Sequence, residues 1–216
     1  MDWYQYLALA ALAYCVAAFG FHFIRLIRLG SPKDLSRKSG SVGKGVLYAN
    51  TVAMMPANKE TAYLHLPTYA VGIIYHLGTF LSLLLFVLLL IGPVREWLFG
   101  NTLLSAVLAA CLSVSTLAGF VLFVKRLVKK EMRVLSHPDD FLSNLIITLF
   151  QLFTFLAMIY LGCSEGISIA YYLVCAGLFI YFPLGKLRHV LYYFSARYHL
   201  GFFYGWRNVW PQQKND

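Results

Sequence analysis

The stretch LHLPTYAVGIIYHLGTF, residues 64–80, decides how the rest of the chain is interpreted. It opens an apolar segment that continues to Pro93, and it carries His65 and His76. A histidine inside a lipid-spanning helix needs a polar partner, because it has lost its hydrogen bonds to water. On an ideal helix these two histidines differ by about 20° in direction and by roughly 16 Å in height. Both imidazoles would then leave one face of the helix, as the axial ligands of stacked haems do.

The composition around this stretch is that of a membrane protein. Of the 216 residues, 60% are hydrophobic and 12% are charged, and the mean hydropathy is +0.67. A soluble domain carries about 25% charged residues. We therefore predict an all-α integral membrane protein, with a five-helix transmembrane bundle over residues 1–199 and a cytoplasmic aromatic-basic tail over residues 200–216. The predicted spans are about 5–28, 67–92, 102–124, 141–163 and 167–190, each long enough to cross about 30 Å of hydrocarbon.

Lysine and arginine are distributed unevenly over the predicted loops. Seventeen of the eighteen lie in the first loop, the third loop, or the end of the last span and the tail, and only Arg95 lies on the other side. This asymmetry predicts a multi-pass protein of the inner (cytoplasmic) membrane, with the N-terminus outside and the C-terminus in the cytoplasm. The net charge of +9 would attract anionic membrane lipid or an acidic partner, and its one-sided distribution argues against nucleic acid. In the first loop, residues 43–56 predict a short amphipathic segment at the membrane surface.

Four of the six histidines fall on the predicted cytoplasmic half. The second and fifth spans run antiparallel, so His76 would face His189, and His65 would face His199 in a second layer. Bis-histidine ligation from two helices is how a bundle holds b-type haem. Residues 189 and 199 differ by about 80° on a straight helix, so the second pair needs a bend or fails. The alternative for His76 is a plain hydrogen bond to a carbonyl or hydroxyl group.

Other polar groups near the predicted inner boundary have several possible roles. His22 is a rival haem ligand, a quinone contact or a plain interfacial histidine. Four cations would either pair with haem propionates or extend to the membrane surface: Arg25, Arg28, Lys186 and Arg188. His137, in the third loop, is expected to be solvated. Pro183 is expected to kink the last span near its inner end.

Several other chemistries are disfavoured by the sequence. The four isolated cysteines, without a CxxC pair, argue against an iron–sulfur cluster or a zinc site in this chain. The predicted spans hold no carboxylate, which argues against a proton-coupled transporter or pump. No Ser/His/Asp set, phosphate-binding loop or HExxH motif is present.

Three stretches together resemble one family: residues 69–80 with His76, PDDFLS at 138–143, and FPLGKLRH at 182–189. They resemble the gamma (cytochrome b) subunit of respiratory nitrate reductase. More broadly, they are similar to the membrane subunits of heterodisulfide-reductase-like and sulfite-reduction-linked complexes. The nitrate-reductase pattern has a further histidine near the outer end of the last helix, where this chain has Ala170 to Leu173. A second haem would therefore use His65, His199 or His22.

The resemblance implies a membrane-anchoring cytochrome b subunit of a respiratory redox complex, with one or two b-type haems. Such a subunit exchanges electrons between quinone or quinol and a cytoplasmic iron–sulfur partner, while the chemistry on the terminal substrate belongs to other subunits. Quinone would bind on the cytoplasmic half, between His22, the first loop and the haem edge. The alternative is a haem-free structural anchor or assembly subunit whose histidines only form hydrogen bonds.

Overall fold

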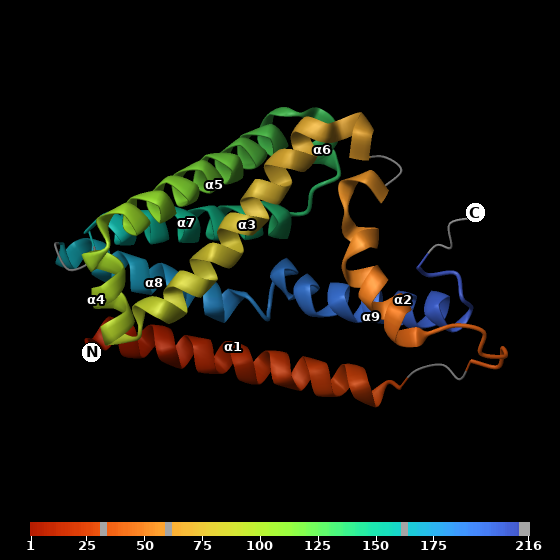
Figure 1. Cartoon of the computed structure of the whole chain (residues 1–216). Coiled ribbons are helices and arrows are strands. Elements are labelled where there is room, and N and C mark those ends of the chain that lie inside the picture. Colours follow the sequence, from red (N-terminus) through yellow and green to blue (C-terminus); the bar gives the residue numbers. More distant parts are fainter. Residues whose placement is uncertain (31–33, 59–61, 161–163, 212–216) are drawn as a thin grey trace. The chain divides into compact units, whose positions relative to one another are not determined.

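The computed structural model describes residues 1–30, 34–58, 62–160 and 164–211, and every regular element in these ranges is helical (Figure 1). The α-helices are α1 (Trp3–Arg28), α2 (Val42–Asn50), α3 (Leu66–Leu89), α4 (Gly92–Gly100), α5 (Thr102–Val128), α6 (Lys130–Val134), α7 (Pro138–Tyr160), α8 (Glu165–Tyr181) and α9 (His189–Trp206). Short 3-10 helices cover Val52–Met54, Pro56–Asn58, Ala62–His65 and Lys186–Arg188.

Four of the described helices, α1, α3, α5 and α7, are long and apolar enough to cross a membrane. A fifth span results if α8 and the helical stretch after its break are counted together. The predicted all-helical class is therefore confirmed, together with the presence of four or five helical segments long and apolar enough to span a membrane. The side of the membrane on which each terminus lies, and which membrane it is, stay predictions.

The last predicted span is broken rather than kinked. Helix α8 ends at Tyr181, the chain turns through residues 182–185, and α9 begins only at His189. Pro183 explains the position of the break, because proline cannot donate the helical hydrogen bond and clashes with the preceding turn. The expectation of one helix continuing to residue 190 is therefore wrong, although the sequence located the cause.

The described chain forms two compact units, which are treated separately here. Unit 1 comprises residues 1–17 and 67–187, and unit 2 comprises residues 18–66 and 188–216. Helix α1 contributes its first half to unit 1 and its second half to unit 2. The sequence predicted a boundary at residue 199 between a membrane-embedded bundle and a cytoplasmic tail. The two units are defined by packing alone, so that boundary stays a prediction.

Unit 1 is a close-packed helical bundle in which α5 lies along α7 and α7 lies along α8 (Figure 1). Its core includes Phe86, Phe150 and Tyr171, which are essentially inaccessible. Two glycines let helices approach closely: a Cβ on Gly78 of α3 would overlap Ser115 of α5, and a Cβ on Gly119 would meet Tyr75 at 2.6 Å. Small residues at contacts of this kind are typical of helix packing in membranes.

Unit 2 is organised around the contact between α2 and α9, which pack side by side. Gly45 of α2 faces Gly201 and Gly205 of α9, and a Cβ on Gly45 would lie 2.5 Å from the Gly205 Cα. The two backbones are therefore nearly in contact. The loop before α2 is also attached to α9, because the Gly40 amide donates to the Trp206 carbonyl at 3.1 Å. Helix α2 occupies the stretch in which the sequence predicted an amphipathic segment.

Candidate functional site

His76 is the best-defined candidate among the predicted site residues. It is the eleventh residue of the 24-residue helix α3, so it lies near the middle of a helix that can span a membrane. Its neighbour Tyr75 is buried and donates a hydrogen bond to the Asn144 carbonyl at 3.1 Å. His76 is exposed instead, on the face of α3 that the other helices of unit 1 leave uncovered.

The imidazole of His76 is held in one tautomer by its own helix. Its Nδ1 lies 2.7 Å from the carbonyl oxygen of Gly72, one turn earlier. A carbonyl can only accept, so Nδ1 carries the hydrogen and, in the neutral ring, Nε2 keeps a lone pair. That Nε2 makes no hydrogen bond to any described residue. Metal-bound histidines have this arrangement, with one nitrogen on a carbonyl and the other on the metal.

Space is available beside His76 for a partner. A Cβ built on Gly72 would meet nothing within 4 Å, in contrast to the crowded Gly78 on the same helix. On this turn of α3 the described residues leave His76 exposed and Gly72 half-buried. An exposed imidazole at this depth in an apolar helix is costly unless a cofactor, another protein or another part of the chain covers it.

His65 does not lie on the same helix as His76. It is the last residue of the 3-10 helix Ala62–His65, and α3 begins at Leu66 with Pro67 in its first turn. The residue before a proline is disfavoured in the α conformation, and proline itself is tolerated in the first turn. The alignment of the two imidazoles was calculated for one ideal α-helix, and the 3-10 turn at His65 departs from that geometry, so the alignment stays a prediction.

Three other predicted histidines belong to unit 2. His189 is the first residue of α9 and is exposed, and His199 is exposed ten residues later on the same helix. His22, on α1, is half-buried, its ring lies 6.5 Å from that of Tyr192, and its buried Nδ1 has no hydrogen-bond partner among the described residues. His65 also belongs to unit 2, and neither a hydrogen bond nor a ring contact joins it to His199.

The predicted pair of His76 and His189 is thus divided between the two units, and the pairing stays a prediction. No group of three or more His, Cys, Asp or Glu side chains in the described residues has the arrangement of a metal site. Haem iron takes only two axial ligands from the protein, so that finding does not bear on a haem. Of the predicted propionate partners, Arg25 and Arg188 are exposed, and Lys186 pairs with Asp140.

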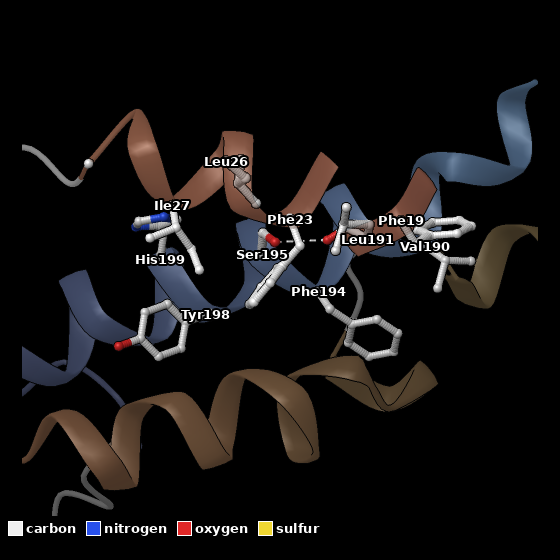
Figure 2. A pocket seen from close by; sticks show the side chains of 11 residues that line it. Phe19, Phe23, Leu26, Ile27, Val190, Leu191, Phe194, Ser195, Tyr198 and His199 are labelled. Carbon is white, nitrogen blue, oxygen red and sulfur yellow. Dashed lines mark hydrogen bonds between the residues drawn. The ribbon is translucent and has the colours of Figure 1, made fainter. Parts of the chain in front are cut away.

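Unit 2 also contains an apolar groove between the end of α1 and α9 (Figure 2). Its volume is about 700 Å³, and side chains such as Phe23, Ile27 and Phe194 line it. Tyr198 and His199 lie toward one end of the groove in Figure 2. The sequence placed a quinone next to His22, but His22 is not among the residues that line this groove.

A more polar cavity of about 880 Å³ adjoins the groove and shares Tyr198 and His199 with it. Its wall contains a bidentate ion pair in which Arg207 donates to Asp34 at 2.6 and 3.1 Å. The Arg207 guanidinium holds the pKa of Asp34 at about 2, with help from hydrogen bonds donated by Ser36. The carboxylate is therefore ionised at neutral pH, and this pair ties the first loop to α9.

Sequence reasoning missed an ionic cluster at the start of α7. Asp140 is buried, accepts a hydrogen bond from the Lys186 ammonium, and lies 3.3 Å from Arg126. Next to it, the hydroxyl of Tyr181 donates to Asp139. Helix α7 begins at Pro138 and so includes both aspartates, three residues before the predicted span begins.

A second missed feature is a row of buried polar side chains along α7. It continues from Asp140 through Ser143, Asn144 and Gln151 to Thr154. The signal was present in the sequence, since polar residues recur there every three, four or seven positions within an apolar segment. Neither the ionic cluster nor this row of polar side chains includes one of the histidines predicted as haem ligands.

No family model, curated protein or solved structure matches this chain. The argument for function therefore depends on the chemistry of the described residues.

Proposed function

We propose that this chain is the membrane cytochrome b subunit of a respiratory redox complex. In that role it anchors the complex and holds b-type haem between its helices. Electrons pass through it between membrane quinone or quinol and a cytoplasmic iron–sulfur partner. The haem supplies the one-electron chemistry, and the chain supplies ligands, burial and charge that adjust its potential.

The main support for the proposal is the hydrogen bonding of the two ring nitrogens of His76. A lone imidazole in the middle of an apolar helix has its Nδ1 on the Gly72 carbonyl and its Nε2 unsatisfied by described residues. That arrangement fits an axial haem ligand, and the open space beside Gly72 fits the approach of a flat porphyrin. His189 is the proposed ligand opposite His76. His65, His199 and His22 are the candidates for a second haem.

The groove of unit 2 supports the quinone part of the proposal. Isoprenoid quinones have a long apolar tail and a polar ring that forms hydrogen bonds. A groove lined by aromatic and aliphatic side chains, with Tyr198 and His199 toward one end, suits such a molecule. Arg25 and Arg188 remain the exposed cations proposed for haem propionates.

The first test measures haem on the complex purified from its own membrane. A reduced-minus-oxidised spectrum should contain a haem b α-band, and a pyridine haemochromogen assay should give one or two haems per chain. His76→Ala should remove at least one haem per chain, because the iron loses a protein ligand. His137→Ala is the matched control, since that histidine lies in a loop with an exposed side chain.

Two results would reject the proposal. One is a wild-type complex without haem b, and the other is His76→Ala with full haem content and full electron transfer. Either result favours the haem-free anchor, in which His76 contributes only its bond to Gly72. That alternative predicts a small loss of stability in His76→Ala and no change in activity.

A further inference from the structure

Unit 1 contains a row of polar side chains that runs through its interior. On α7, Asp140, Ser143, Asn144, Gln151 and Thr154 are all buried, and Gln151 and Thr154 are inaccessible. At 1.5 Å per residue, positions 140 and 154 are about 21 Å apart along the helix axis. The row therefore covers most of the thickness of a hydrocarbon layer about 30 Å deep.

One end of the row meets bulk water at the ionic cluster. Asp140 binds Lys186, whose side chain is 57% exposed. Ser143 and Tyr181 share a hydrogen bond of 2.8 Å between their hydroxyls, and Tyr181 also donates to Asp139. This end thus carries charged groups that reach the surface.

The middle of the row is a hydrogen-bonded link between α7 and α3. The Gln151 amide donates to the Tyr75 carbonyl and to the Thr79 hydroxyl, both at 2.8 Å. Tyr75 in turn donates its hydroxyl to the Asn144 carbonyl. Hydrogen bonds therefore join α3 and α7 over the part of the row from Asn144 to Gln151.

Four buried polar atoms in the interior of unit 1 have no full hydrogen bond to a described residue. They are the hydroxyl oxygens of Ser82 and Tyr171 and the amide oxygens of Asn144 and Gln151. Thr154 and Cys175 also interact with the Tyr171 hydroxyl, although neither contact has the distance and angle of a full hydrogen bond. Buried polar groups in native proteins are nearly always paired, and internal water is the usual partner when the protein supplies none.

The other end of the row also opens to water. Tyr171 is followed by Tyr172, whose hydroxyl accepts a bond from Gln5 at 3.4 Å. The Asp2 amide donates to the Gln5 side chain at 2.9 Å. A cavity of about 480 Å³ is lined there by Gln5, Tyr172 and charged residues including Arg95 and Glu96.

We propose that unit 1 holds a chain of internal water molecules along this row, and that protons cross the bundle through it. Water at the four unsatisfied atoms would connect the hydroxyls of the two halves, which the protein alone leaves unlinked. Hydroxyl groups and water can each accept and release a proton, while the Gln151 amide fixes the position of the water beside it.

Such a row would conduct protons passively, down their gradient, and would not pump them. No carboxylate lies between Asp140 and Asp2 among the described side chains of the row, so no group there changes charge during transfer. The path lies in unit 1 and uses no histidine, so it is independent of the proposed haem. It also gives the buried polar atoms a function beyond packing.

The test measures proton flux in liposomes that contain the full-length protein. Pyranine inside the vesicles reports the internal pH after an external pH jump, with potassium and valinomycin to clamp the potential. The wild-type protein should conduct protons clearly faster than protein-free liposomes. Tyr171→Phe should reduce that flux about tenfold, because it removes a hydroxyl that would bind water between the two halves of the row.

The variant is chosen so that a folding defect cannot explain the result. The Tyr171 hydroxyl makes only weak contacts, with Thr154 and Cys175, so its loss should change thermal stability little, and a thermal melt of each variant checks this. Tyr160→Phe makes the same change at an exposed position near the end of α7 and should keep the wild-type flux. Ser82→Ala should lower the flux, and its matched control is Ser113→Ala, whose hydroxyl bonds only its own helix.

The inference fails if the wild-type protein conducts no faster than empty liposomes, or if Tyr171→Phe conducts like the wild type. His76→Ala separates this proposal from the redox proposal. It should lose haem without losing proton flux, so either proposal can fail alone.

Discussion

Asp140 shows at the scale of one residue how a buried charge is stabilised in this bundle. Two cations approach it, one from α5 and one from the turn after α8, and the His137 amide donates to its second oxygen at 2.9 Å. A buried carboxylate with several donors is tolerated, whereas removal of the acid leaves the cations unopposed.

We expect Asp140→Ala to lower the free energy of unfolding by about 2 kcal/mol, less than for a fully buried pair because Lys186 is largely exposed. The measurement is denaturant unfolding of the detergent-solubilised protein. Glu131→Ala, at an exposed acid on α6, should change stability by less than about 0.5 kcal/mol. Equal stability of the two variants would show that the ion pairs of Asp140 contribute nothing.

The sequence selected His76 as a candidate ligand but did not show its surroundings. The position of His76 within an apolar segment was enough to select it, since polar residues there are rare. The bond to Gly72 follows from local helix geometry and was not anticipated. The partners of Asp140 lie 14 and 46 positions away in the sequence, so no local pattern connects them.

At the scale of elements, the hydrophobic pattern located the long helices closely. The predicted spans 5–28 and 67–92 correspond to α1 and α3, which end within about three residues of those limits. The connection between the second and third spans was interpreted as a loop, yet it forms α4. Pro93 in the first turn explains the helix, since proline is well suited to that position.

The contact between α2 and α9 gives a test at this scale. Gly45→Ala should lower the free energy of unfolding of unit 2 by about 1–3 kcal/mol, because the added Cβ overlaps backbone atoms of α9 that cannot rotate away. Gly43→Ala, two residues earlier in the same helix, should be neutral or stabilise by up to about 1 kcal/mol, because nothing lies within 4 Å of its Cβ and alanine favours helix.

The readout is Trp206 fluorescence during denaturation, in a background whose other three tryptophans are replaced by phenylalanine. The Trp206 indole reports on unit 2 because it donates to the Ser36 carbonyl there. Opposite signs for the two alanine variants support the close contact. If both variants change stability in the same direction by the same amount, the backbones of α2 and α9 are not in contact in solution.

At the scale of the whole molecule, net charge is concentrated in one unit. The sequence of unit 2 contains eleven lysines and arginines against three acids, while unit 1 contains seven against six. Nearly all of the net charge of +9 therefore belongs to unit 2. The inside-positive rule assigns such a segment to the cytoplasmic side.

This assignment predicts the side on which introduced cysteines react. In a cysteine-free background, Glu96→Cys on α4 should react with a membrane-impermeant maleimide in intact cells. Lys44→Cys on α2 should react only after the cells are opened. Both positions are exposed, so accessibility to the reagent differs only through the membrane. The reverse pattern would invert the predicted orientation of the termini.

The close backbone contact of Gly45 with Gly201 and Gly205 also limits which substitutions this chain can accept over evolutionary time. A side chain that clashes with another side chain can be rescued when its neighbour becomes smaller. Here the opposing atoms belong to the main chain, which is the same in every amino acid. No second-site change among the twenty residues can restore the lost space, so each of these three positions is expected to keep its glycine independently.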